Sequence, residues 1–222
     1  MQLDTNPQRT VKVSAPGTVA NLVCGFDVLG LCLNHPADEM QVTITGKSVI
    51  TISHTGEFPL PFDAAQNTAG AALLEIKKLL PAQTGFDIFI KKNINPGSGI
   101  GSSAASAAGA VVAANYLLGN PFTKEEMVQF ALFGEKAASG VKHADNVAPC
   151  IYGGITLIRS IFPVDIIRLS SPPLWVTVVH PQIEVRTADA RQILKKQVLL
   201  KDAIKQWGNI AGLVAGLLQH DY

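Results

Sequence analysis

The sequence is poor in cysteine and in net charge. Its three cysteines, Cys24, Cys32 and Cys150, include no C-x-x-C pair, so we expect buried free thiols in a reducing compartment. The formal net charge is +1, and Lys and Arg never cluster beyond a dipeptide. Because duplex binding depends on a basic footprint, nucleic acid is not expected as a partner.

Long apolar runs are missing as well. No run approaches the ~18 residues that a membrane-spanning helix requires. Residues 1–10 are polar, without the apolar stretch of a signal peptide. The sequence therefore predicts a cytoplasmic protein with no membrane partner. A chain of 222 residues that is 47% hydrophobic is long enough to bury a substantial core.

Alternating apolar residues predict strands, and apolar residues at helical spacing predict helices. Strands are expected at residues 11–15, 40–45, 49–53, 86–91, 154–160, 164–169 and 174–180. Helices are expected at residues 68–80, 102–118, from Thr123 onward, 187–199 and 202–218. The short connection at residues 46–48 is of hairpin length, so we expect antiparallel pairs and an α+β fold.

A glycine-rich stretch, NPGSGIGSSAAS at residues 95–106, precedes the second predicted helix. Its glycines allow successive backbone N–H groups to converge on one anion at the start of a helix. A flexible glycine turn is the alternative interpretation. The stretch contains no lysine or arginine and fits neither the Walker loop nor the dinucleotide-binding fingerprint. We therefore expect a bound phosphate to be compensated by Mg²⁺ that a carboxylate holds.

The segment P-G-S-G-I-G-S-S-A, residues 96–104, resembles the phosphate loop of the GHMP kinases, P-x-x-x-G-L-G-S-S-A. Three more segments resemble, in the same order, motifs of the homoserine kinase branch of that family. They are S-A-P-G-T-V-A-N-L-V-C-G-F-D-V-L-G-L at 14–31, H-A-D-N-V-A-P-C-I-Y-G-G at 143–154 and V-R-T-A-D-A-R at 185–191. The resemblance implies ATP-dependent phosphorylation of the side-chain hydroxyl of L-homoserine in threonine biosynthesis.

The same resemblance implies the domain organisation of that family. Residues 1–170 would form an N-terminal, ATP-binding α/β domain with a mixed sheet. Residues 171–222 would form part of a ferredoxin-like C-terminal domain, with the boundary at the Ser-Ser-Pro-Pro stretch near residues 170–173.

The resemblance also assigns roles to individual residues. It places ATP against Asn67, Pro96, Gly97, Ser98, Gly99, Ile100, Gly101, Ser102, Ser103 and Ala104. It makes Ser103, or alternatively Ser102, a Mg²⁺ ligand together with Glu135. It makes Asn21, Asp27, Asn146 and Arg191 the homoserine-binding residues, with Asp27 on the ammonium, Arg191 on the carboxylate and Asn146 on the reacting hydroxyl. Thr187 is implied to lie near the transferring phosphate, so Asn146, Thr187 and Glu135 are the catalytic candidates.

Each of these residue types also has a structural use. Asn21 and Asp27 suit an Asx turn, and Asn67 and Thr187 suit helix N-caps. Glutamate is ordinarily a surface residue, which is the alternative for Glu135.

The sequence also raises the roles of two more polar residues and two alternative functions. His143 is expected to be structural, and a role for Asp145 as a catalytic base is left undecided. Another GHMP kinase, of the mevalonate-pathway type, is disfavoured by Asn21, Asp27 and Arg191 together. A non-catalytic nucleotide-binding module is the second alternative.

The C-terminal part of the sequence departs from the family pattern. Residues 192–222 contain nothing like the family's third glycine motif, G-x-S-G-S-G-P-[ST]. The predicted helix at 202–218 is apolar on most of its surface and therefore requires cover. We expect either a fragment of a longer protein or a homodimer, and weak nucleotide binding and poor turnover by residues 1–222 alone.

Overall fold

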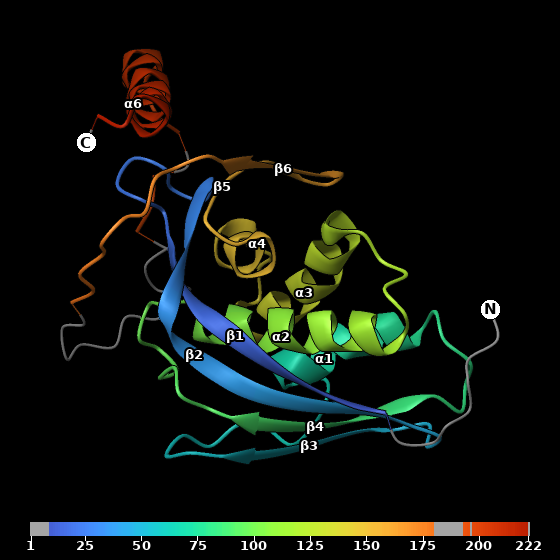
Figure 1. Ribbon diagram of the computed structural model, residues 1–222. Helices are drawn as coiled ribbons and strands as arrows, with labels where there is room; N and C mark the ends of the chain where they lie inside the picture. The colour runs from blue at the N-terminus through green and yellow to red at the C-terminus, as the bar shows by residue number, and fades with distance from the viewer. Residues whose placement is uncertain (1–8, 180–192, 196, 222) are drawn as a thin grey trace.

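The computed structural model describes residues 9–179, 193–195 and 197–221. Within them, a six-stranded mixed sheet carries helices on one face (Figure 1). Its strands are β1 (Thr10–Ala20), β2 (Leu29–Thr45), β3 (Ile50–Thr55), β4 (Gly85–Lys91), β5 (Ile155–Ile161) and β6 (Val164–Leu169). The helices are α1 (Thr68–Lys77), α2 (Ser102–Leu117), α3 (Lys124–Ser139), α4 (Ala144–Tyr152) and α6 (Leu200–Gln219). This architecture confirms the mixed-sheet α+β fold class.

The strand order differs from the hairpin that the short connection at residues 46–48 predicts. The order is β3-β4-β2-β5-β6, with β1 paired to β2, so β4 lies between the two strands expected to pair. It runs antiparallel to β2 and parallel to β3. Gly85 allows this insertion, because a Cβ there would lie 2.0 Å from the Lys47 carbonyl oxygen and 2.1 Å from that of Val49. The sheet still contains antiparallel pairs, as expected.

Helix α2 packs closely on the sheet because its residues are small. Alanine is the commonest of its buried residues. A Cβ at Gly109 would lie 2.7 Å from the Met40 sulfur and 2.9 Å from the Ala15 Cβ. This close approach fixes α2 against β1 and β2. The glycine-rich stretch that precedes α2 is thereby brought beside β1, where the backbone N–H of Thr18 donates to the Ile100 carbonyl.

Some predicted elements are confirmed and others are wrong. The capping box at Thr123 forms, with Glu126 donating its N–H to the Thr123 hydroxyl and accepting the Thr123 N–H. Residues 174–179 are not a strand, because no described strand pairs with them. Residues 193–195 and 197–199 are not helical, and the rest of the helix expected at 187–199 lies outside the described residues. Helix α4 was not expected, since Asn146 and the internal Pro149 are poor helix formers.

Helix α6 forms close to the predicted position, and Figure 1 shows it at the end of the sheet that carries β5 and β6. Leu213, Val214 and Leu217 pack against the cluster around Leu29. No residue of α6 is fully buried, and Trp207 and Leu218 are exposed. Cover by a second subunit stays a prediction, as does the domain boundary near residue 170.

The structure also bears on the expectations for the cysteines and for membrane-spanning helices. The three cysteines are free, and each is partly exposed rather than fully buried. None of the described helices has the length and hydropathy needed to cross a membrane.

Candidate functional site

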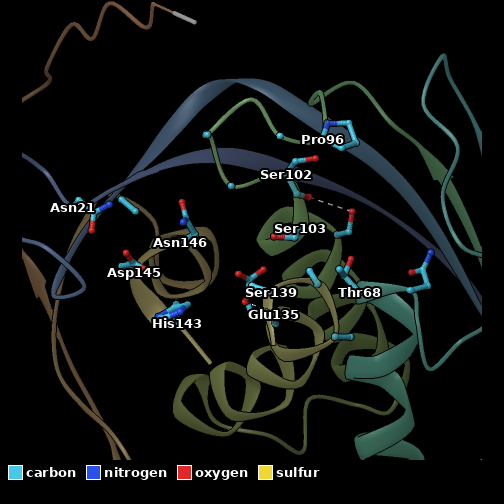
Figure 2. A pocket seen from close by; sticks show the side chains of 18 of the residues that line it. Asn21, Thr68, Pro96, Ser102, Ser103, Glu135, Ser139, His143, Asp145 and Asn146 are labelled. Atoms are coloured by element: carbon cyan, nitrogen blue, oxygen red, sulfur yellow. Dashed lines mark hydrogen bonds between the residues drawn. The ribbon is translucent and has the colours of Figure 1, made fainter. Parts of the chain in front are cut away.

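A cavity of about 910 Å³ lies where the glycine-rich stretch, α3, α4 and the end of β1 meet. Figure 2 shows side chains from all of these elements turned toward one space. The predicted site residues that line it are Asn21, Asp27, Asn67, Pro96, Gly97, Gly99, Gly101, Ser102, Ser103, Glu135 and Asn146. His143 and Asp145 line it too. Ser98 and Ile100 of the same loop, and Ala104 in the first turn of α2, are not among the lining residues. The motifs that are far apart in sequence therefore share one cavity.

The glycine loop turns through three left-handed glycines. Gly97, Gly99 and Gly101 have φ values of 80°, 78° and 68°, a left-handed conformation that side chains disfavour. Gly101 is the N-cap of α2 and contributes no side chain to its first turn. The amides at the start of α2 lack intrahelical partners, and the helix dipole is positive there. The loop can therefore bind an anion through its backbone.

A lysine that sequence reasoning missed lies beneath this loop. Lys92 is only 6% exposed and forms an ion pair with Asp38, which is fully buried. The ammonium also donates to the Ser102 carbonyl at 2.7 Å and to the Ser106 hydroxyl at 2.9 Å. A lysine has three N–H donors, and all three are engaged here. Lys92 lines the cavity, but with its three donors engaged it secures the first turn of α2 rather than offering a free donor to a phosphate.

The sequence does contain a signal for Lys92. Phe86, Ile88 and Ile90 face the core from β4, and the same two-residue period continues to Lys92. The charge of Lys92 made it resemble a surface residue, like the exposed Lys91 beside it. Burial lowers the pKa of Lys92, and the neighbouring Asp38 carboxylate opposes this effect.

The two serines at the start of α2 differ in their surroundings. Ser102 is buried and its hydroxyl donates to the Ile94 carbonyl at 2.9 Å. Ser103 lies near the carboxyl group of Glu135 on α3, where its hydroxyl favours the charged carboxylate. Ser103 is therefore better placed than Ser102 to join Glu135 in binding a cation.

Glu135 is buried rather than on the surface. It is 6% exposed, and its Oε1 has no hydrogen-bond partner among the described residues. Burial raises the pKa of Glu135, and the negative charge of Asp145 raises it further. A buried carboxylate oxygen without a partner is unfavourable unless a ligand satisfies it.

No set of three His, Cys, Asp or Glu side chains within residues 9–179, 193–195 and 197–221 could hold a metal by itself. Mg²⁺ at phosphate sites often has only one or two protein ligands, because phosphate and water supply the others. Glu135 and Ser103 fit this kind of site.

Asn67 is the N-cap of α1, which confirms the structural use expected for it. Its Oδ1 accepts from the N–H groups of Ala69 at 3.0 Å and Gly70 at 3.3 Å. Its Nδ2 donates to the Pro61 carbonyl at 2.9 Å. The side chain, which lines the cavity, is thus held firmly, and contact with a nucleobase stays a prediction.

Asn21 and Asp27 lie in a tight loop between β1 and β2. Asn21 Oδ1 accepts from the Asp27 N–H at 3.0 Å. This hydrogen bond spans six residues and closes the loop, so it is not the Asx turn expected from the sequence, which joins residues two apart. The residues Asn21, Leu22, Val23 and Asp27 all have positive φ, from 25° to 72°. Such a concentration of strain is typical of segments that present ligand-binding groups. Both side chains line the cavity.

Helix α4 supplies Asp145 and Asn146. A Cβ at Gly30 of β2 would lie 1.8 Å from the Asp145 carbonyl oxygen, so only glycine allows α4 to approach this closely. His143 precedes the helix, with its Nδ1 3.8 Å from Asp27 Oδ1. In Figure 2, Asn146 and Asn21 lie on the same side of the cavity, across from Glu135 and Ser103. Thr187 and Arg191 lie outside the described residues.

Comparisons with known proteins agree with this geometry. Residues 67–154 match the model of the GHMP kinases N terminal domain. The homoserine kinase of Chloroherpeton thalassium is 47% identical over 221 residues, which cover 94% of this chain and 69% of that protein. That of Methanococcus maripaludis (strain S2) is 41% identical, over 96% of this chain and 71% of that protein.

A solved structure gives the same result. The crystal structure of homoserine kinase from Cytophaga hutchinsonii superposes with a TM-score of 0.84 at 43% identity. The match covers 100% of this chain and 70% of that one. With this identity over more than two thirds of its relatives, the chain belongs to the homoserine kinase family of the GHMP kinases.

Proposed function

We propose that this chain binds ATP and L-homoserine side by side and transfers the γ-phosphoryl group to the homoserine side-chain hydroxyl. The product would be O-phospho-L-homoserine, an intermediate for threonine synthesis. One observation carries the proposal. A single cavity brings the anion-binding loop at Gly97–Gly101 together with Asn21, Asp27 and Asn146, which suit a small amino-acid alcohol.

The nucleotide half of the cavity follows from the backbone. Loop amides and the start of α2 would hold the phosphates, and Asn67 would contact the base. Glu135 and Ser103 would hold Mg²⁺, and the partnerless Oε1 of Glu135 supports this assignment. The ion would neutralise charge on the β- and γ-phosphates.

The amino-acid half depends on charge and hydrogen bonding. The Asp27 carboxylate would bind the ammonium of homoserine, and Asn146 would donate to its reacting hydroxyl. Arg191 and Thr187 keep their proposed roles on the carboxylate and the transferring phosphate. Phosphoryl transfer depends mainly on alignment and charge stabilisation, so it does not require a dedicated base. Asp145 is close enough to Glu135 to influence its pKa, and its role as a base is left open.

Calorimetric titration and product detection together test the proposal. ATP-Mg²⁺ should bind to residues 1–222, and L-homoserine should bind to the nucleotide-loaded chain. Phosphorus NMR should then show O-phosphohomoserine accumulating with ADP release. Incubation should be long and the chain concentration high, so that slow product formation is also detected.

A comparison of homoserine with mevalonate as phosphoryl acceptors distinguishes the proposed function from its alternatives. Mevalonate carries an alcohol but no ammonium, so it should be a poorer acceptor than homoserine. The Asp27→Asn variant should bind homoserine more weakly and ATP with unchanged affinity. Phosphorylation of mevalonate in preference to homoserine would contradict the proposal. Nucleotide binding with no response to homoserine would instead support a non-catalytic nucleotide-binding module.

A further inference from the structure

Thr18 of β1 contacts two parts of the site at once. The residue is fully buried. Its backbone N–H donates to the carbonyl of Ile100 in the glycine loop at 3.1 Å. Its hydroxyl donates to Asn146 Oδ1 on α4 at 2.8 Å. The loop assigned to the phosphates and the side chain assigned to the acceptor hydroxyl are therefore joined through one residue.

The local backbone is shaped for these contacts. The pairing of β1 with β2 shifts register between Pro16 and Thr18, and such bulges often redirect side chains beside active sites. Gly17 lies within the bulge, and a Cβ there would lie 3.3 Å from the Ile100 carbonyl oxygen. The absence of a side chain at this position lets the loop approach β1.

Gly101 closes over the same contact from the other side. A Cβ at Gly101 would lie 2.1 Å from the Thr18 hydroxyl oxygen and 2.9 Å from Asn146 Oδ1. The hydrogen bond between Thr18 and Asn146 therefore runs directly against the backbone where α2 begins. Three sequence motifs, at residues 14–31, 95–106 and 143–154, meet at this point.

The direction of the hydrogen bond determines what Asn146 can offer to a substrate. A carboxamide has one oxygen that accepts and one NH₂ group that donates twice. Because Oδ1 accepts from Thr18, the orientation of the whole carboxamide is set. Figure 2 shows Asn146 extending from α4 into the cavity. Its NH₂ group is then the part left to interact with an acceptor.

We propose that Thr18 is a positioning residue for phosphoryl transfer, whose hydroxyl orients the Asn146 carboxamide so that its NH₂ group faces the acceptor hydroxyl. This inference rests on the proposed function for the role of Asn146. Without the Thr18 hydroxyl, the carboxamide loses its fixed orientation. The acceptor is then poorly aligned, while the backbone contact from Thr18 to Ile100 remains.

Three variants test the proposal in residues 1–222. Thr18→Val keeps the shape and removes the hydroxyl, and Thr18→Ser keeps the hydroxyl. Thr156→Val is the matched control, because Thr156 of β5 is also fully buried but its hydroxyl has no hydrogen-bond partner among the described residues. The measurements are the side-chain amide NMR signals of Asn146, identified by their loss in Asn146→Ala, the ATP-Mg²⁺ affinity and kcat for homoserine.

Thr18→Val should shift the Asn146 amide signals and lower kcat roughly 10- to 100-fold, the range expected from misalignment. Its ATP affinity should remain within about twofold of the wild type, because the Ile100 contact is made by backbone. Thr18→Ser and Thr156→Val should resemble the wild type in all three measurements.

Unchanged Asn146 signals in Thr18→Val would overturn the inference, as would an equal loss of ATP affinity and kcat, which indicates a general structural role. Failure of the proposed function looks different. The wild-type chain would then bind ATP but give no phosphohomoserine, which removes the catalytic role of Thr18, while the amide signals would still report its contact with Asn146.

Discussion

The ammonium of Lys92 is paired with the carboxylate of Asp38 beneath the first turn of α2, where both groups are excluded from water. Asp38 does more than balance this charge. Its Oδ1 accepts the N–H groups of Asn93 and Ile94, both at 2.9 Å. The pair thus connects the end of β4 to the glycine loop and holds the start of α2.

Asp38→Asn should be strongly destabilising. The change preserves side-chain size but leaves the Lys92 charge without a counter-charge in the interior. Removal of one partner from a buried ion pair typically lowers the free energy of unfolding by about 3–5 kcal/mol. Urea denaturation of the wild type and the variant measures this difference.

The neighbouring residue offers a matched control. Glu39 pairs with Lys91 at 2.8 Å, but this pair is exposed. Exposed ion pairs contribute little to stability, so Glu39→Gln should leave the denaturation midpoint unchanged. Similar losses in both variants would show that burial does not govern the contribution of Asp38.

Glu135→Gln should stabilise the chain in the absence of ligand. Burial raises the pKa of Glu135 above its ordinary value of 4.5, so the folded state holds this proton more tightly than the unfolded state. Glu135 therefore contributes its full stabilisation of the folded state below pH 4.5, and this stabilisation is lost as pH rises through the raised pKa. Glutamine mimics the protonated form at every pH. The melting temperature at pH 7.5 should therefore rise, by about 2–4 °C for each kcal/mol gained.

Bound ATP-Mg²⁺ should reverse the order of the melting temperatures of the wild type and Glu135→Gln. ATP-Mg²⁺ should stabilise the wild type more than Glu135→Gln, since the variant has no carboxylate for the ion. Glu57→Gln makes the same change of charge at an exposed position and should alter neither result. A Glu135→Gln chain that gains as much from ATP-Mg²⁺ as the wild type would rule out Glu135 as a Mg²⁺ ligand.

Gly99→Ala and Gly101→Ala separate backbone strain from steric overlap. Both glycines have positive φ, but a Cβ at Gly99 has no neighbour within 4 Å, whereas one at Gly101 overlaps Thr18. Gly99→Ala should lower the free energy of unfolding by about 1–2 kcal/mol, the strain of a left-handed residue. Gly101→Ala adds overpacking and should lower it by about 3–5 kcal/mol. Equal effects in urea denaturation would contradict the overlap at Gly101.

The features that the sequence predicted well have short-range causes. The glycine loop requires positive φ at Gly97, Gly99 and Gly101, and only the residues themselves are needed to infer this. The N-cap at Asn67 and the capping box at Thr123 likewise depend on neighbours a few residues away. Such local preferences are visible in a single chain.

The features that the sequence did not predict depend on distant contacts. Insertion of β4 beside β3 is possible because Gly85 fits against the carbonyls of Lys47 and Val49. In the sequence, Asp38 and Lys92 each resemble a surface charge. Only their pairing in the structure shows why both can be buried. Thr18 likewise has no recognisable role until its hydroxyl meets Asn146, 128 residues away.

Leu217→Ala tests whether α6 supports the loop that carries Asn21 and Asp27. The strained backbone of this loop needs support from outside, and α6 supplies it through Leu213, Val214 and Leu217, with Gln206 donating to the Cys24 carbonyl. Leu217 is only partly buried, so we expect a loss of about 1–2 kcal/mol, less than for a fully buried leucine.

The more telling effect should be on ligand binding. Homoserine affinity, measured by calorimetry with a non-hydrolysable ATP analogue present, should fall several-fold in Leu217→Ala, because Asn21 and Asp27 lose their fixed positions. Affinity for the analogue should not change, since Leu22, Val28 and the cluster around Leu29, which α6 packs against, lie outside the glycine loop. Leu218→Ala, at the exposed neighbouring position, should match the wild type in both affinities. An equal fall in both affinities for Leu217→Ala would mean that α6 stabilises the fold as a whole rather than the amino-acid half of the cavity.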